Sequence, residues 1–348
     1  MNANSVATFV GLDYAENVVQ VVVVDPAGQI LGARRCPNDQ AAIVGYGQRF
    51  GPVAGAAIEA CCGAAALTDV LVQEYGWAVQ MAHPGFVQRM KRNPDKTDYS
   101  DAHVLADLRR VGYVPQVWLA PPAVRELRRL VRYRQSLVDQ GRAIKLRVRA
   151  LLREHRLKVP AEIQRVWTRR GRTWLAHLSQ AETVLPETSR WILTQHLGDL
   201  AFGAARQAAS AARLRRVVEP DSLVLKLLEQ PGVGLVTACV LRAEIGSFER
   251  FRTGKQLAHF CGLSPQNVSS GERQADAGLV RGGNPLLKAT LVELAHRLAV
   301  CVPQWKAFRA RLLAAGKPRC VIAAAIANRW VRKLYYAMSA AEAASPAA

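Results

Sequence analysis

Acidic residues are scarce in this chain of 348 residues. Aspartate and glutamate total 27 against 47 lysines and arginines, which gives a formal net charge of +20 at pH 7. Such an excess of positive charge implies a polyanionic partner, and nucleic acid is the simplest one. The alternative is a basic protein without such a partner, or one that binds a membrane surface.

Paired cysteines and long apolar runs are also lacking. No apolar run approaches the roughly twenty residues of a membrane span, and the first residues lack the features of a signal peptide. Half of the residues are nevertheless hydrophobic (50%), so we expect a globular chain of two or three domains. The odd number of cysteines and the absence of Cys-x-x-Cys argue against a disulfide framework or a zinc ribbon and favour a reducing cytoplasm; they are Cys36, Cys61, Cys62, Cys239, Cys261, Cys301 and Cys320.

The N-terminal third has the pattern of a mixed α/β sheet. Short runs rich in valine are separated by tight turns, which is typical of an antiparallel meander. Helical patterns then alternate with two further apolar runs, which is typical of an α/β domain. The pattern predicts strands over 7–12, 17–25, 29–35, 53–59 and 77–82 and helices over 40–50 and 64–75.

Four carboxylates lie at the ends of predicted strands or on a predicted helix of this region. Asp13 ends the first strand, Glu59 ends a later strand, and Asp98 and Asp101 share one face of a predicted helix over 98–111. Hard Mg²⁺ prefers oxygen ligands, and two ions can hold the attacking and leaving oxygens of a phosphodiester. The order and placement match the metal site of ribonuclease-H-like nucleases, including the junction resolvase RuvC. For each carboxylate, a turn-forming or helix-dipole role is the alternative.

The middle of the chain is rich in arginine. A helical pattern over 123–157 keeps an apolar stripe, which suits packing on a second helix or a coiled coil. Further helices are predicted over 161–178, 187–197 and 204–218. The basic face of the long helix suits nucleic-acid backbones, although a solvated face without a ligand is the alternative. The candidate contacts on this face are Arg128, Arg132, Lys145 and Arg149.

A Pro-Gly-x-Gly turn precedes a predicted helix over 235–245. It contains Gly232 and Gly234 and matches a helix-hairpin-helix, in which the backbone N–H groups of the turn bind a DNA phosphate. A plain helical hairpin is the alternative. Further helices are predicted over 286–299 and 317–340, the last of which carries the candidate contact Arg329.

A second loop, rich in serine and glycine, lies before the helix over 286–299. Ser269, Ser270 and Gly271 have no apolar periodicity, and a hydroxyl there is a candidate nucleophile toward a phosphodiester. Arg273 and Arg281 are candidates for phosphate contacts. An ordinary polar loop with a helix N-cap is the alternative.

Together these segments resemble a known family. VGLDYA, AIEACCG, KTDYSDAHVLA, PGVGLVTACVLRAEIG, and GLSPQNVSSGERQ with RGGNPLLK occur in that order across nearly the whole chain. They are similar to segments of the DEDD transposases of the IS one-ten family of insertion sequences, which are related to Piv-type DNA invertases. The sequence departs from the family pattern in residues 274–277, which are less basic than expected, and at Val280, where a polar residue is usual.

The resemblance implies a fold with three parts. Residues 1–118 would form a RuvC-like, ribonuclease-H-like DEDD domain, and residues 119–218 a helical coiled-coil region. Residues 219–340 would form a mainly helical transposase domain with the helix-hairpin-helix and the nucleophilic serine. The low-complexity composition at the end of the chain further predicts a disordered tail over residues 341–348.

The resemblance also implies the chemistry and the partners. Mg²⁺ would be bound by Asp13, Glu59, Asp98 and Asp101, and Ser270 would form a covalent phosphoserine link to DNA, with Ser269 as second choice. A structured noncoding RNA, the bridge RNA, would pair with donor and target DNA in the bacterial cytoplasm. The protein would act as a dimer that assembles into a tetramer.

Three other functions remain as alternatives. A RuvC-like junction nuclease would use metal-activated water and leave no protein–DNA adduct. A DNA invertase would need no RNA. A binding protein with a decayed carboxylate site would have no activity, although all four carboxylates are present.

Overall fold

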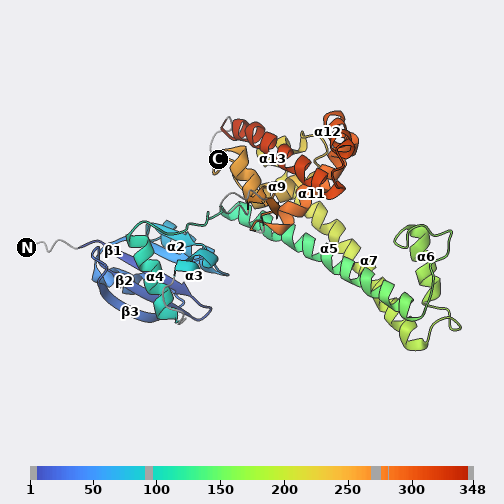
Figure 1. Cartoon of the computed structure of the whole chain (residues 1–348). Coiled ribbons are helices and arrows are strands. Elements are labelled where there is room, and N and C mark those ends of the chain that lie inside the picture. The colour runs from blue at the N-terminus through green and yellow to red at the C-terminus, as the bar shows by residue number, and fades with distance from the viewer. Residues whose placement is uncertain (1–5, 91–96, 268–275, 281, 344–348) are drawn as a thin grey trace, which may run out of the picture. The chain divides into compact units, whose positions relative to one another are not determined.

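The computed structural model describes residues 6–90, 97–267, 276–280 and 282–343 (Figure 1). The chain divides into two compact units, Met1–Ala120 and Pro121–Ala348, which we call the sheet unit and the helical unit. Each is described by itself. The boundary predicted after residue 218 falls within the helical unit, so the division into separate coiled-coil and transposase domains stays a prediction.

The sheet unit contains one five-stranded sheet in the order β3-β2-β1-β4-β5. β1, β2 and β3 pair antiparallel, whereas β1, β4 and β5 pair parallel. The parallel pairs need crossover connections, which the helices supply. The predicted mixed α/β sheet is therefore confirmed. Its strands are β1 (Thr8–Tyr14), β2 (Val18–Val24), β3 (Ile30–Pro37), β4 (Val53–Glu59) and β5 (Val79–Ala82).

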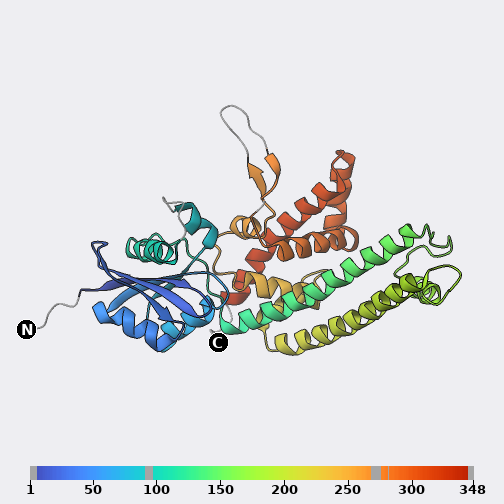
Figure 2. The same ribbon diagram turned by 90° about the horizontal axis from the view of Figure 1, so that it is seen from below.

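Strand alternation builds a core on each face of this sheet. Val10 and Leu12 of β1 are fully buried in the core that α1 and α2 share. Phe9 lies on the opposite face, against α4. Figure 2 shows α1 and α2 (blue) on one side of the sheet and α4 (teal) on the other. The helices of this unit are α1 (Gln40–Gly47), the 3₁₀ turn η1 (Gln48–Phe50), α2 (Ala64–Gln73), α3 (Pro84–Met90), which the sequence pattern does not predict, and α4 (Asp98–Arg110).

Two long antiparallel helices, α5 (Pro122–Glu154) and α7 (Glu187–Val218), lie side by side in the helical unit (Figure 1). Much of the apolar stripe on α5 is buried, as the pattern predicts. Leu127 and Val131 enter the main core of this unit together with Leu214 of α7. At the far end, α6 (Arg169–Leu178) closes a smaller core with both long helices.

Two predictions for this region are wrong, namely the start of one helix and a break between two others. The helix predicted over 161–178 begins only at Arg169, because Thr168 caps it and accepts a hydrogen bond from the backbone N–H of Gly171 at 3.3 Å. The helices predicted over 187–197 and 204–218 are one helix, α7, in which Gly198 and Gly203 are internal. Each glycine costs roughly 1 kcal/mol relative to alanine, but packing along α5 outweighs that cost.

The remaining helices of the helical unit pack around the fully buried Phe248. The sequence pattern does not predict the helix α12 (Pro303–Ala314). Nor does it predict the hairpin of β6 (Pro265–Asn267) and β7 (Asp276–Leu279). The last helix reaches Ala343, so residues 341–343 are helical rather than part of the predicted tail; residues 344–348 lie outside the described part. The helices are α8 (Ser222–Leu228), α9 (Leu235–Ile245), α10 (Gly254–Phe260), α11 (Pro285–Cys301), α12 (Pro303–Ala314) and α13 (Arg319–Ala343). In the described residues, no helix combines the length and apolarity that a membrane crossing requires.

Candidate functional site

A row of polar residues crosses the sheet near the end of β1. Asp13 pairs with Gln20 of β2, and Gln20 pairs with Arg35 of β3. On the other side, Leu12 pairs with Ile58, so Asp13 and Glu59 stand level on adjacent parallel strands, roughly 4.8 Å apart. Directly paired residues share a face of the sheet. We call Arg35, Gln20, Asp13 and Glu59 the polar row.

The polar row lies on the face that α4 covers. Phe9 precedes Asp13 by four residues on β1 and packs against α4. Ala57 precedes Glu59 by two residues on β4 and packs with Leu105 of α4. Because side chains on a strand alternate between faces, Asp13 and Glu59 project on this same side.

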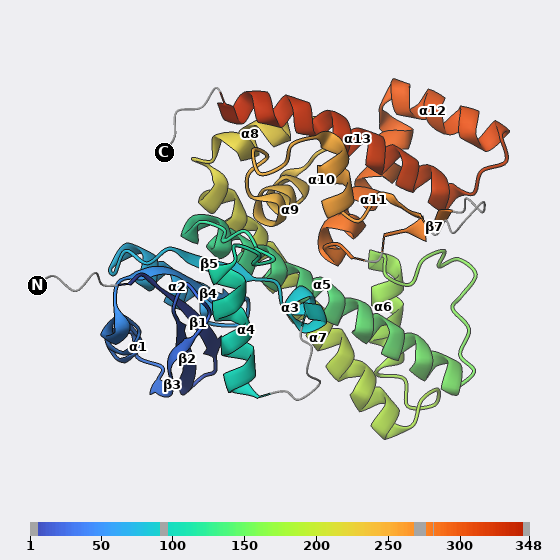
Figure 3. The same cartoon turned by 60° about the vertical axis from the view of Figure 1, so that its left-hand side comes forward.

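Helix α4 lies beside the sheet (Figure 3), and its first turn carries two more carboxylates close to the polar row. A Cβ atom on Gly11 would lie only 1.8 Å from the carbonyl oxygen of Ala102, so the glycine permits close contact between helix and strand. Thr97 caps the helix, and Asp98 and Asp101 fill its first turn. Asp101 is buried, with 4% of its surface exposed. A carboxylate in a first turn is stabilised by the helix dipole.

The carboxylates act on their surroundings. Partial burial raises the pKa of the Cys61 thiol, and the negative charges of Glu59 and Asp13 raise it further. Both carboxylates thus lie near one thiol. The Oδ2 atom of Asp98 lies 3.8 Å from Nη2 of Arg35, and both side chains are more than half exposed. This is a weak surface pair.

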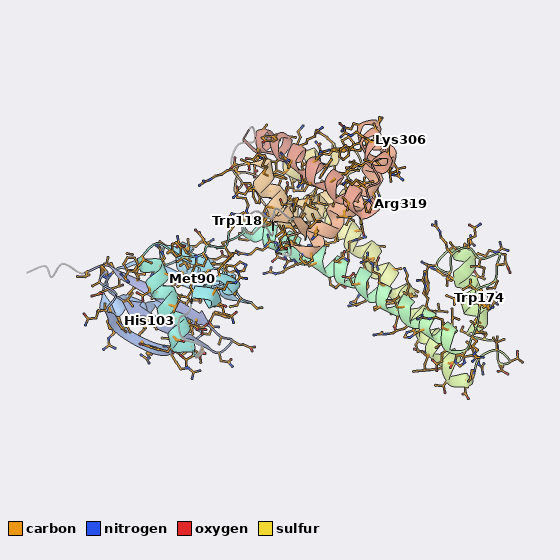
Figure 4. All side chains as sticks on the ribbon, in the orientation of Figure 1. Met90, His103, Trp118, Trp174, Lys306 and Arg319 are labelled. Atoms are coloured by element: carbon orange, nitrogen blue, oxygen red, sulfur yellow. The ribbon has the colours of Figure 1, made fainter. Side chains whose placement is uncertain are left out.

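His103 lies on α4 close to these carboxylates in sequence (Figure 4). Its Nε2 atom is 3.5 Å from a carboxylate oxygen of Asp107, and its ring stacks on Tyr99 at a centroid distance of 6.2 Å. The described contacts of His103 are therefore within its own helix, and we give it no role in the site.

Two short strands of the helical unit, β6 and β7, precede and follow the predicted nucleophile in the sequence. β6 and β7 pair antiparallel, with Pro265 opposite Leu279 (Figure 2). The backbone N–H of Val280 donates to the carbonyl of Ser264 at 3.0 Å and closes the base. The predicted residues Ser269, Ser270, Gly271, Arg273 and Arg281 lie outside the described residues.

A cleft of about 810 Å³ opens at the base of this hairpin, between α10 and α13. Its wall is mostly apolar and includes the buried residues Ala258 and Leu263. The guanidinium of Arg329, a predicted nucleic-acid contact, lies 4.2 Å from the centre of the Phe308 ring and also lines the cleft. Cations at the cleft suit a phosphate backbone. They are Lys255, Arg329 and Arg332.

Two other predicted contacts, Arg128 and Arg132, bind a buried glutamate. Glu244 is 3% exposed and accepts hydrogen bonds from Nε and Nη2 of Arg132 at 2.8 and 2.9 Å. Asn284 donates to it at 2.5 Å, and Nε of Arg128 lies 3.7 Å away. Asn284 also caps α11, just after the predicted basic loop. These contacts tie α5, α9 and α11 together; the pattern around Glu244 gives no sign of them.

The other predicted contacts are placed differently. Lys145 lies over the ring of Trp167, with Nζ 5.7 Å from its centre, and Arg149 is exposed. Gly232 has a φ of +81° in the turn between α8 and α9, and Gly234 caps α9. The glycine turn thus lies between two helices, and its assignment as a helix-hairpin-helix that binds a DNA phosphate stays a prediction. A groove of about 920 Å³ runs beside Gly232 between α5, α9 and α11, and its basic residues are Arg132, Arg134, Arg142 and Arg297.

Two family models match this sequence. The DEDD transposase model of IS110 elements, described as a transposase, matches residues 10–156, and the model described as a transposase of the IS116/IS110/IS902 family matches residues 225–310. The chain belongs to the IS110 family of transposases. Membership makes it an enzyme that cuts and rejoins DNA. The first match includes all four carboxylates, and the second includes Ser270.

Similar proteins extend along nearly the whole IS110-family chain. A probable family 20 transposase of Pseudomonas aeruginosa is 29% identical, over 95% of this chain and 96% of its own length. The transposase for insertion sequence element IS1111A of Coxiella burnetii is 26% identical, over 83% of this chain and 77% of its own. The insertion element IS110 uncharacterized 43.6 kDa protein of Streptomyces coelicolor is 25% identical, over 91% of this chain and 90% of its own.

The residues of this IS110-family site fit a hard divalent cation by donor chemistry. Asp13, Glu59 and Asp101 offer carboxylate oxygens on one side of the sheet, which are the donors that Mg²⁺ prefers. As their side chains stand, however, the described part of the chain holds no group of three or more carboxylate, imidazole or thiol side chains that could share an ion. A metal ion held by three of these side chains would therefore require other side-chain rotamers.

Proposed function

We propose that this transposase joins DNA to Ser270 in a covalent intermediate, with Mg²⁺ bound by Asp13, Glu59, Asp98 and Asp101. The observation that carries the proposal is the level placement of Asp13 and Glu59 on one face of the sheet, beside the acidic first turn of α4. The sheet order β3-β2-β1-β4-β5, antiparallel and then parallel, supports a RuvC-like, ribonuclease-H-like domain. The role follows from the site rather than from the fold alone.

The proposed chemistry is two successive transesterifications. The Oγ atom of Ser270 attacks a backbone phosphorus, a Oγ–P bond forms, and the 3′-oxygen leaves as a hydroxyl, which gives a 5′-phosphoserine. A 3′-hydroxyl of the partner strand then attacks that phosphorus, and Ser270 regains its hydroxyl. Mg²⁺, when bound, supplies charge neutralisation at the phosphate and lowers the pKa of the attacking hydroxyl. One phosphodiester is made for each one broken, so no high-energy cofactor is needed.

We further propose that a bridge RNA selects donor and target DNA by base pairing. The basic face of α5, with Lys145 and Arg149, and the cations beside the hairpin cleft would bind backbones rather than bases. A dimer that assembles into a tetramer would bring two DNAs together. Base pairing would then provide most of the sequence specificity, as in other RNA-guided systems.

The decisive experiment is a covalent-adduct assay with the full chain. Protein, Mg²⁺, cognate RNA and end-labelled donor DNA are mixed and separated on a denaturing gel. Ser270→Ala and Asp13→Asn should abolish a protein-linked DNA band. Ser269→Ala tests the neighbouring hydroxyl, and Glu74→Gln controls for loss of an exposed carboxylate elsewhere in the sheet unit.

Each outcome selects one function. Loss of the band in Ser270→Ala but not in Ser269→Ala supports the proposal. DNA cleavage without a linked band, equal in wild type and Ser270→Ala, would identify a hydrolytic nuclease. Full activity after ribonuclease treatment of the protein–RNA mixture would contradict the proposed role of the bridge RNA. It would favour a DNA invertase that needs no guide RNA.

A further inference from the structure

Arg35 is a basic side chain at the polar row that the chemistry above does not use. It lies on β3 directly across from Gln20, which in turn lies directly across from Asp13. Its side chain therefore projects on the face that holds the carboxylates. The contact with Asp98, at 3.8 Å between Nη2 and Oδ2, agrees with that direction.

Arg34, the preceding residue, projects on the opposite face. It pairs with Val21, which is buried in the core under α1 and α2. Its guanidinium lies 5.8 Å from the centre of the Tyr46 ring of α1. The two adjacent arginines thus carry the same charge but project on opposite faces of the sheet.

The Arg35–Asp98 pair is suited to exchange. Arg35 and Asp98 side chains are 68% and 62% exposed, and they meet through one long contact. Such pairs contribute little to stability, because water and salt compete for both charges. A divalent ion at Asp98 would compete with Arg35 for the same carboxylate. The released guanidinium has the planar donor geometry that binds phosphate oxygens in pairs.

We infer that Arg35 binds a DNA backbone phosphate at the carboxylate site and pairs with Asp98 when no metal is bound. This inference rests on the proposed metal site of Asp13, Glu59, Asp98 and Asp101. It assigns to Arg35 two opposing effects, since its charge disfavours a cation at Asp98 and favours a phosphate beside it. Removing the charge should therefore change metal affinity and DNA affinity in opposite directions.

The test compares Arg35→Gln with Arg34→Gln in the full chain. Calorimetric titration with Mn²⁺, without nucleic acid, should show about threefold to tenfold tighter binding in Arg35→Gln, because a nearby positive charge is gone. Binding of a labelled DNA duplex in Ca²⁺ should weaken, and the slope of log affinity against log salt should fall by about one, as expected for one lost phosphate contact. Arg35→Lys should retain the salt slope.

The two proposals fail in distinguishable ways. Unchanged Mn²⁺ affinity and salt slope in Arg35→Gln would overturn the role of Arg35 and leave the serine adduct untouched. Equal changes in Arg34→Gln would do the same, because only bulk charge would then matter. Absence of Mn²⁺ binding in wild type, or unchanged binding in Asp13→Asn, would instead overturn the metal site itself.

Discussion

Glu244 in the helical unit and Asp98 in the sheet unit each contact arginine, but their surroundings differ. Glu244 is 3% exposed and accepts three hydrogen bonds, two from Arg132 and one from Asn284. Asp98 has a side chain that is 62% exposed and lies 3.8 Å from Arg35. A carboxylate and a guanidinium therefore form a buried, hydrogen-bonded pair in the helical unit and an exposed, weak pair in the sheet unit.

The difference follows from desolvation. A buried carboxylate that loses its partners keeps the cost of desolvation, so its contacts are maintained. The hydrogen bonds to Glu244 raise the pKa of Arg132, because the carboxylate stabilises the charged guanidinium. An exposed carboxylate can exchange an arginine for water or a cation at little cost. The exposed carboxylate of Asp98 is therefore open to exchange, whereas that of Glu244 is held between α5, α9 and α11.

The largest expected effect on stability is the loss of the buried contacts of Glu244. Glu244→Ala should lower the free energy of unfolding of the helical unit by about 3 kcal/mol, because it leaves partly buried donors unpaired. Urea denaturation measures this change. The control is Glu126→Ala, which removes an exposed carboxylate paired with Arg129 and should cost less than about 1 kcal/mol. Similar losses in both variants would remove the contrast between buried and exposed pairs.

The close contact of α4 with β1 gives the second largest effect. Gly11→Ala should destabilise the sheet unit by about 2 kcal/mol or more, because the new Cβ would meet the carbonyl of Ala102 at 1.8 Å. The shift of α4 should also reduce adduct formation. Gly45→Ala, in α1 with no atom within 4 Å of the new Cβ, should instead stabilise by about 0.5 kcal/mol. Thermal unfolding of both variants checks this; a harmless Gly11→Ala contradicts the described packing.

Asp98→Asn should separate binding from stability. The free energy of unfolding should change by less than about 1 kcal/mol, because the pair with Arg35 is exposed. Mn²⁺ affinity should fall about tenfold or more, since one charged oxygen ligand is lost. Asp107→Asn, on the same helix, removes the partner of Arg110 and should leave Mn²⁺ affinity nearly unchanged. A stability loss as large as that of Glu244→Ala would show that Asp98 is a structural residue.

The smallest effect concerns Cys61. Burial and the charges of Glu59 and Asp13 raise its thiol pKa, so less of it is thiolate at pH 8. Removing one charge in Glu59→Gln should lower that pKa and speed alkylation of Cys61 about twofold to fivefold. The rate is measured by mass spectrometry without metal in a Cys62→Ser background. An unchanged alkylation rate in Glu59→Gln would show that the charge of Glu59 does not influence the Cys61 thiol.

Local patterns predicted the sheet and the carboxylates on it. Apolar runs bounded by turn residues indicate the strands. Asp13 and Glu59 each lie at the end of such a run, which predicts that they stand at the same edge of the sheet. The same patterns failed where long-range contacts decide: Gly198 and Gly203 suggest a helix break, yet packing along α5 keeps α7 continuous. The predicted backbone contacts Arg128 and Arg132 have a buried partner that no local signal reveals.

The sequence by itself determined the basic charge, the mixed α/β order and, through its motifs, the IS110 family of transposases. These properties depend on composition and on neighbours in the chain. Only the tertiary structure decided that Arg35 stands in one row with Gln20 and Asp13 while Arg34 faces the other side of the sheet, because strand register links residues far apart in sequence. It also decided that Glu244 joins three helices, because burial is a property of the packed chain.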